Sequence, residues 1–224
     1  MKKLIIAFLI TLGSFSIVSA EIGVNIGVSG SLGEYTATGS ENENGEISAK
    51  RSEKALGGIA SYFIEKELSF LPWGLGRITV GYDKAAHKIS TASITTNRTE
   101  SEKTPGANLV VTQNVSADIE NITTTYATFR IFDWMYVKSG SMSMDVKTTE
   151  GLETGSSYPD ASLDGTVIGF GFHKETDDGF FLRAEWTETE IDGVTLTSST
   201  NTDNTVTLDE VTGEQYRLSV GKAF

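Results

Sequence analysis

The sequence contains no cysteine and only two histidines among its 224 residues. Without cysteine there is no disulfide framework, no cysteine-based zinc site and no lipid-modified N-terminal cysteine. Basic residues are also scarce, with 18 Lys and Arg against 30 Asp and Glu. A chain this acidic lacks the positive surface that binds nucleic acid, so we expect no nucleic-acid partner. We also expect no cofactor.

The first twenty residues have the pattern of a secretory signal peptide. A basic start at Lys2 and Lys3 precedes an apolar stretch over residues 4–18, and Val18 and Ala20 occupy the −3 and −1 positions of a cleavage site. We therefore expect cleavage after Ala20, leaving one domain over residues 21–224. A retained membrane helix is the alternative, but this stretch is short and lacks a basic stop.

No second long hydrophobic stretch follows, yet apolar residues recur at every other position. A membrane-spanning β-strand needs only about 9–11 residues with alternate ones apolar. Such alternation appears in eight places, which predicts an all-β fold, a closed antiparallel up-and-down transmembrane β-barrel of eight strands. The outward residues of these strands are expected within 22–28, 56–64, 78–82, 127–131, 142–146, 168–172, 180–186 and 216–220.

The predicted connections alternate between short turns and long polar stretches. Residues 68–76, 133–134 and 174–179 are short, and Asp178-Gly179 favours a hairpin turn. Residues 36–54, 84–122, 147–164 and 189–212 are rich in Thr, Ser, Asn, Asp and Glu, which indicates solvated loops. Short turns at one end and long loops at the other are typical of outer-membrane barrels, with both termini at the short-turn end.

Aromatic residues gather at two heights on this strand map. Two aromatic belts are what two membrane–water interfaces select. The belt at the short-turn end comprises Phe63, Phe70, Trp73, Phe132, Trp134, Tyr136, Phe172, Phe180 and Phe224, and the belt near the long loops comprises Tyr35, Tyr82, Trp186 and Tyr216.

The last strand ends in Tyr216, Leu218, Val220 and a terminal Phe224 at alternating positions. This ending resembles the C-terminal signature of Gram-negative outer-membrane barrels, although Lys222 stands where that family has an aromatic or aliphatic residue. The resemblance is to small eight-stranded barrels of the OmpA and opacity-protein type. It implies localisation in the outer membrane, lipid as a neighbour, and the barrel-assembly machinery as a partner that reads this strand.

Charged residues fall on the face opposite the apolar positions. The expected lumen network comprises Arg77, Arg130, Arg183, Arg217, Glu65, Asp83 and Glu185, with Asp145 on the same face. Arginines in a narrow lumen need acidic partners or water, because an isolated charge in a low dielectric is costly. An eight-stranded barrel is nearly filled by side chains, so we predict a plug, with a charged pore lining as the alternative. Inward glycines such as Gly81 and Gly171 are expected to make room for these arginines.

Catalytic and metal sites are not expected in this chain. His87 and His173 lack a recognisable nucleophile motif nearby, and Asp192, Asp203, Asp209 and Glu210 lack the spacing of a calcium loop. A soluble lipocalin-like barrel also has period-two strands, but inward arginines, unequal connections and the terminal Phe favour the membrane barrel. We predict a structural, surface-recognition or adhesion role with long acidic extracellular loops. A small porin-like channel is the alternative, and an enzyme acting on lipid is less favoured.

Overall fold

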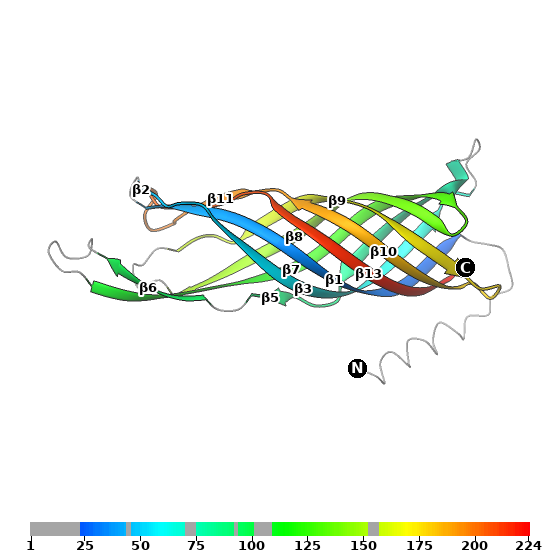
Figure 1. Ribbon diagram of the computed structural model, residues 1–224, viewed down its shortest axis with the longest axis horizontal. Helices are drawn as coiled ribbons and strands as arrows, with labels where there is room; N and C mark the ends of the chain where they lie inside the picture. Colours follow the sequence, from blue (N-terminus) through cyan, green and yellow to red (C-terminus); the bar gives the residue numbers. More distant parts are fainter. Residues whose placement is uncertain (1–22, 44–45, 70–74, 92–93, 101–108, 152–156) are drawn as a thin grey trace, which may run out of the picture.

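The protein is described by a computed structural model, whose described residues are 23–43, 46–69, 75–91, 94–100, 109–151 and 157–224 (Figure 1). The expected signal peptide, and with it the start of the mature domain, lies outside the described residues. No helix among the described residues is long and apolar enough to cross a membrane. The elements are β1 Val24–Glu43, β2 Glu46–Ile47, β3 Arg51–Glu67, the 3-10 helix η1 Leu75–Arg77, β4 Ile78–Ala85, β5 Ile89–Ser90, β6 Ile94–Glu100, β7 Leu109–Phe132, β8 Met135–Gly151, β9 Ala161–Glu175, β10 Phe180–Ile191, β11 Val194–Thr197, β12 Thr205–Leu208 and β13 Val211–Ala223.

Eight long strands close into an antiparallel barrel, as the sequence predicts. Their order around the wall is β1, β13, β10, β9, β8, β7, β4 and β3, and pairing of β3 with β1 completes the circle. The N-terminal end of β1 and the end of the chain meet at one mouth of the barrel (Figure 1). There the amide of Gly23 donates to the carbonyl oxygen of Phe224, and the amide of Phe224 donates to that of Val24. The short turns β3–β4, β7–β8 and β9–β10 lie at the same end.

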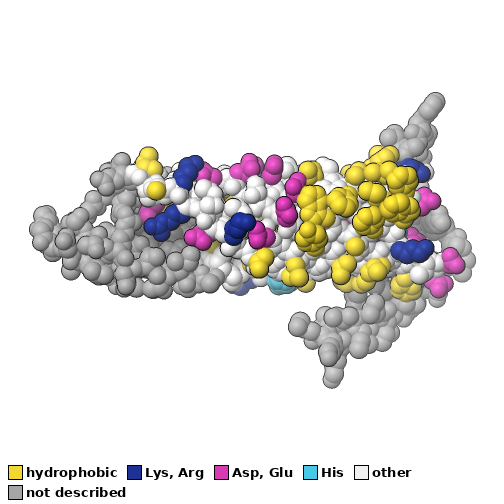
Figure 2. Space-filling view, in the orientation of Figure 1, with side chains coloured by type: hydrophobic (Ala, Val, Ile, Leu, Met, Phe, Trp, Pro, Cys, Tyr) yellow, Lys and Arg dark blue, Asp and Glu magenta, His cyan; other side chains and the backbone are white. Residues whose placement is uncertain are grey.

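The outer surface of the barrel changes from apolar to polar partway up every strand. The outward positions of each strand can be followed from the terminus end toward the other end of the barrel. The last apolar or small outward residues, one in each strand, are Leu32, Leu56, Tyr82, Ala127, Val137, Ile168, Trp186 and Tyr216. The next outward positions carry Glu34, Lys54, Lys84, Thr125, Ser139, Thr166, Glu188 and Glu214. Figure 2 shows the resulting apolar zone at the terminus end and charged side chains beyond it. We call the apolar-surfaced part the lower barrel and the rest the upper barrel.

The lower barrel matches the dimensions of a membrane. In β1 its outward face runs over residues 24–32, and about 9–11 tilted residues suffice to cross a bilayer. Outward aromatic rings contact one another here. Trp134, in the β7–β8 turn, stacks against Phe132 and Phe172, and the rings of Phe170 and Trp186 meet at a tilt. The lower barrel is therefore the part that lies in lipid.

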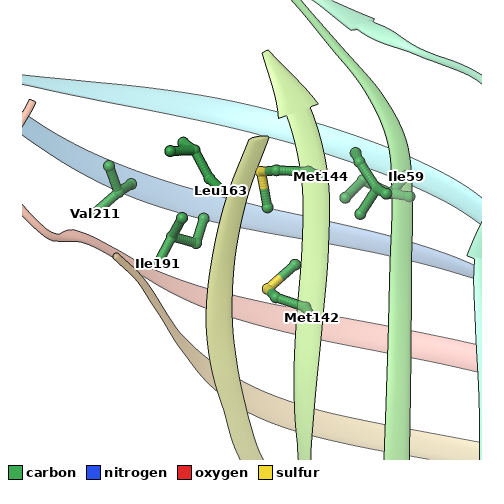
Figure 3. Packing of buried hydrophobic residues seen from close by; sticks show 7 residues of the cluster. Ile59, Met142, Met144, Leu163, Ile191 and Val211 are labelled. Atoms are coloured by element: carbon green, nitrogen blue, oxygen red, sulfur yellow. The ribbon is translucent and has the colours of Figure 1, made fainter. Parts of the chain in front are cut away.

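The interior of the upper barrel is apolar. A buried cluster lines its inner face, contributed by β3, β7, β8, β9, β10 and β13 (Figure 3). Neighbouring residues in one strand show the alternation, because Leu163 is buried while Asp164 is exposed, and Ile191 is buried while Glu190 is exposed. The cluster comprises Ile59, Ile122, Met142, Met144, Leu163, Ile191 and Val211.

The expected outward face of β8 is wrong. Met142 and Met144 point into the barrel and are 7% and 5% exposed, and Asp145 lies on the outside, where it accepts from Asn121 and Ser162. Both methionines lie in the part of β8 that belongs to the upper barrel. They point inward because the interior of the upper barrel is apolar. Three expected belt residues, Phe63, Tyr136 and Tyr35, also point inward.

The expectation of irregular loops is wrong for most of the long connections. The barrel strands continue upward, β6 forms a hairpin with β7, and β11 pairs with β12, which in turn pairs with β1. These stretches alternate Thr with Val or Leu, as in Val194–Thr197, and β-branched residues favour strands. Their polarity reflects water on the outside of the sheet rather than a lack of regular structure.

Candidate functional site

The interior of the lower barrel is occupied by a hydrogen-bonded layer of charged residues. Its centre is the carboxylate of Glu65 on β3, which is 2% exposed. Arg183 on β10 donates to both Glu65 oxygens from Nη1 and Nη2, at 2.5 and 2.8 Å, and Tyr126 donates its hydroxyl to Oε1 at 2.7 Å. The two-pronged guanidinium contact fixes the arginine in one orientation. The Arg183 guanidinium also lies over the ring of Phe181, with 4.4 Å from Cζ to the ring centroid.

A second ion pair joins β13 to β4. Arg217 donates from Nη1 to Asp83 Oδ2 at 2.8 Å, and both side chains are buried. Ser61 donates to the same oxygen at 2.9 Å, and its hydroxyl lies 2.6 Å from that of Ser29. The serines therefore link strands β1, β3, β4 and β13 through one carboxylate.

The third pair joins Lys138 to Glu185, and its lysine was missed by sequence reasoning. The Nζ atom of Lys138 lies 3.1 Å from Glu185 Oε1, and the two side chains are 4% and 6% exposed. The error followed from the face assigned to β8, because placing Met142 outward places Lys138 outward as well. A lysine facing lipid near mid-membrane costs about 2–4 kcal/mol, and that cost was the signal that the assignment should be reversed.

The terminus-end mouth of the barrel holds the more exposed members of the layer. Arg130 donates to Glu67 Oε1 at 3.1 Å. His173 contacts Glu175 at 3.2 Å and accepts from Arg183 Nε at 3.0 Å through Nδ1. Arg77 lies apart from this layer, contrary to the expected network. It is exposed at the rim, where it donates to backbone carbonyl oxygens of β7.

Charges balance within the four Lys and Arg ion pairs of the layer. The four cations are Arg130, Lys138, Arg183 and Arg217, and the four acids are Glu65, Glu67, Asp83 and Glu185. Each cation has an acidic partner within 3.1 Å. Removing charges from water is costly unless each is paired and hydrogen-bonded, and this arrangement meets that condition.

Inward glycines make room for aromatic rings within this layer. A Cβ atom on Gly81 would lie 2.5 Å from the ring of Tyr126, and one on Gly171 would lie 2.5 Å from the ring of Tyr136. These glycines therefore make room for tyrosine rings, which pack against the glycine backbone, and not for arginine side chains as expected. The tyrosines fill the cross-section between the ion pairs.

A small cavity lies directly above the charged layer. This cavity, between the layer and the apolar cluster, has a volume of about 20 Å³ and is lined by Asp83, Lys138, Met142 and Arg217, among others. That volume is close to the minimum needed for one water molecule. The interior can thus hold a bridging water, but the cavity is too small for a hydrated solute.

Ion pairs on the outside of the upper barrel are more exposed to solvent than those in the interior of the lower barrel. Lys88 and Ser90 donate to the carboxylate of Asp118, and these hydrogen bonds lower the pKa of Asp118 below its ordinary value. Lys54 donates to Glu34 at 2.6 Å, with both side chains at least half exposed. Exposed pairs of this kind contribute little to stability.

The histidines and acidic residues form no evident reactive site in the described part of the chain. His87 on the upper barrel accepts from the backbone amide of Ala60 at 3.2 Å and lies 3.0 Å from the carbonyl oxygen of Lys88. Both ring nitrogens are thus used in backbone contacts. Among described residues, no group of three or more His, Asp or Glu side chains has a geometry suited to a metal ion.

The C-terminal residues Tyr216, Leu218 and Val220 point outward from β13 and are 67%, 64% and 42% exposed. Lys222 extends over the rings of Phe180 and Phe224, with its Nζ atom 4.8 and 5.6 Å from their centroids. The lysine stem can therefore lie on apolar surface while the charge reaches the interface. This contact accounts for a lysine at the position that departs from the family signature.

Comparisons with known proteins identify the fold without identifying a family. No protein-family model and no curated protein sequence matches the chain. The solved structure of the outer-membrane protease OmpT from Escherichia coli aligns with a TM-score of 0.51 and 8% identity, covering 94% of this chain and 100% of OmpT. At this identity the alignment shows a shared barrel fold and says nothing of activity.

Two smaller barrels also align. The attachment invasion locus protein Ail of Yersinia pestis gives a TM-score of 0.34 and 15% identity over 84% of this chain and 97% of Ail. Neisserial surface protein A, NspA, gives 0.35 and 12% over 87% of this chain and 97% of NspA. The protein is an outer-membrane β-barrel by its closed eight-stranded wall, its lipid-facing lower surface and the OmpT alignment.

Proposed function

We propose that this protein is a surface-recognition or adhesion protein, in which the lower barrel is a sealed anchor and the upper barrel is the binding part. The observation that carries the proposal is the reversal of polarity along the strands. An apolar core under a charged outer surface is the arrangement of a water-soluble β domain, here continuous with the membrane anchor. A chain that only spanned the membrane would not need this second core.

A small porin-like channel is the alternative, and a conductance measurement separates the two. Refolded protein is inserted into planar bilayers, with a known porin as the positive control. We expect no steady conductance, because paired charges and tyrosine rings fill the lumen. Steady single-channel steps, with an ion selectivity that changes in Arg217→Ala, would support the channel instead.

Adhesion itself is tested on cells that produce the protein. A non-adherent Gram-negative host carrying the wild-type chain is compared with one carrying a variant whose β11–β12 hairpin, residues 194–208, is replaced by a short Gly-Ser turn. We expect cells with the wild type to bind immobilised extracellular-matrix proteins or epithelial cells, and the variant to bind less. Equal binding by wild type and empty host would reject the recognition role.

The proposal includes no catalytic activity. OmpT is a protease, so refolded protein is incubated with unstructured peptides and with phospholipid, and the products are measured by mass spectrometry. We expect both substrates to remain intact. Cleavage that persists in highly purified protein would place the chain among the barrel enzymes.

We further propose export through a signal peptide cleaved after Ala20 and assembly through the C-terminal strand. The intact mass of protein from the outer-membrane fraction tests the cleavage position. Deletion of Phe224 removes the residue whose backbone closes β13 on β1, and we expect the deleted protein to remain in the periplasm or be degraded. Normal insertion of the deletion variant would contradict a role for Phe224 in assembly.

A further inference from the structure

One strand of the upper barrel has no neighbour on one of its sides. Strand β3 begins at Arg51, whereas its neighbour β4 ends at Ala85, opposite Ser61. Along residues 51–59, β3 is paired with β1 on one side, and no described strand pairs with it on the other. Figure 1 shows β3 and β6 diverging toward the loop end.

The register identifies which backbone groups are free. In an antiparallel pair each residue directs its N–H and C=O to the same side, and successive residues alternate sides. The carbonyl oxygen of Ala60 accepts from Ala86, so even-numbered residues of β3 face the open side. On this side the N–H and C=O groups of Ser52, Lys54, Leu56 and Gly58 have no strand partner among the described residues.

A side chain marks where regular pairing stops. The amide of Ala60 donates to His87 Nε2 at 3.2 Å instead of donating to a strand carbonyl. Above this point the inward-facing residues Glu53 and Ala55 are exposed, whereas inward residues of other strands, such as Leu163 and Val211, are buried. The wall of the upper barrel is therefore open beside β3, next to its apolar interior.

We infer that this open edge is where the protein binds an extended segment of a partner polypeptide, which adds to β3 as an antiparallel strand. The inference rests on the proposed recognition function and specifies how the partner would be bound. Strand addition uses main-chain hydrogen bonds for affinity and alternate side chains for specificity. The edge supplies four donors and four acceptors, and an added strand would cover the exposed inward residues Glu53 and Ala55 next to the apolar interior.

A second copy of this chain does not fit the edge. Two copies in one membrane are related by an axis along the membrane normal, so their β3 strands run in the same direction. Edge-to-edge contact would then be parallel, which is the less stable arrangement. A soluble segment outside the cell is free to approach in the antiparallel direction.

The neighbouring side chains define the partner's chemistry. The inward side of an added strand would lie near Ile59 and Ala85, so alternate apolar residues are favoured there. On the outward side Leu56 is 86% exposed, and Lys54 is held by Glu34 at 2.6 Å. The partner is thus an extended peptide with apolar residues at every other position and uncharged or apolar residues between them.

The experiment uses a proline that removes one edge donor. Leu56→Pro deletes an N–H on the free side and leaves the bonds to β1 in place, whereas Leu56→Ala shortens the same side chain and keeps the N–H. A phage-displayed library of random twelve-residue peptides is selected on wild-type protein in nanodiscs. We expect enriched peptides to alternate apolar residues, to bind Leu56→Ala within about threefold of wild type and to bind Leu56→Pro at least about tenfold more weakly.

Ser52→Pro provides a second edge variant, and gel mobility without boiling verifies that each variant is folded. Peptides that bind wild type and both proline variants equally would overturn the edge inference while leaving recognition by another surface intact. Failure to enrich any peptide would also overturn it, and the cell-binding assay then tests recognition separately.

Amide hydrogen exchange tests the edge without a ligand. In the free protein we expect the amides of Ser52, Lys54, Leu56 and Gly58 to exchange at least about a hundredfold faster than those of Glu53, Ala55 and Gly57, which face β1. A selected peptide should slow the four fast amides. Equal protection of even and odd positions in the free protein would show that the edge is already paired, and would overturn the inference.

Discussion

The lower and upper barrel are built from the same eight strands with opposite arrangements of polar and apolar residues. Below the change in surface polarity, side chains such as Leu218 face out and ion pairs such as Arg183–Glu65 face in. Above it, glutamates face out and residues such as Leu163 face in. The strands continue through the boundary, so the solvent on each side, lipid or water, decides which face is apolar.

This comparison also locates the membrane surface. The change occurs at a single outward position in each strand, between Trp186 and Glu188 on β10 and between Tyr216 and Glu214 on β13. Trp186 and Tyr216 are directly paired, as are Glu188 and Glu214. Because neighbouring strands change polarity at paired positions, the change marks the height of the membrane–water interface and is not a peculiarity of one strand.

The largest effect is expected from removing a charge inside the lower barrel. Arg183→Ala leaves the Glu65 carboxylate buried with Tyr126 as its main remaining donor. Breaking a buried pair costs about 3–5 kcal/mol, so we expect a clearly lower urea midpoint for unfolding from lipid vesicles. Arg77→Ala is the control, because Arg77 is exposed at the rim, and it should change the midpoint little. Similar midpoints for both variants would mean that water replaces the arginine.

A smaller effect is expected on the outer surface, where one substitution is placed in each region of β13. Leu218→Arg introduces a charge into the lipid-facing wall, at a cost of about 2–4 kcal/mol. Thr212→Arg places the same side chain outward in the upper barrel, directly opposite Glu190, and should cost nearly nothing. Unfolding midpoints and folding yields in vesicles measure both. Equal costs would show that the lipid boundary is misplaced.

The smallest effect is an increase in stability. Glu34, Glu214 and Glu188 are directly opposite one another across β1, β13 and β10, and like charges in such pairs are destabilising. Glu214→Gln removes the middle charge and should stabilise the fold by about 0.2–1 kcal/mol at low salt, with less gain at high salt. Glu210→Gln changes the net charge equally outside the row and serves as the control. A gain independent of salt would exclude the electrostatic explanation.

Much of the lower barrel could be predicted from the sequence because period-two alternation is strong where one face meets lipid. The eight strands and their order along the chain are confirmed by the structure. Strand β8 was assigned the wrong face because Met142 and Met144 lie in the upper barrel, where apolar residues point inward. An apolar residue predicts an outward side chain where the strand lies in lipid and an inward side chain where the strand lies in water, so one rule cannot serve for the whole strand.

The same reversal explains which interior residues were missed. The structure brings together most of the expected network, namely Glu65, Asp83, Glu185, Arg130, Arg183 and Arg217. These residues lie in strands whose lower parts alternate clearly between apolar and polar positions. Lys138 was hidden by the face given to β8, and Arg77 precedes β4, so strand parity does not apply to it. The upper strands were taken for loops because Thr-rich sequences are common to solvated loops and to sheets exposed to water.

The packed charged layer has a consequence for the cell that carries the protein. The number of open pores in an outer membrane sets how fast nutrients and toxic compounds enter, and a cell must limit that number. In the proposed role as a sealed anchor, a barrel whose cross-section is filled by Tyr126, Tyr136 and the ion pairs around Glu65 would add no such route. The amount of this protein at the surface could therefore rise or fall without changing how leaky the envelope is.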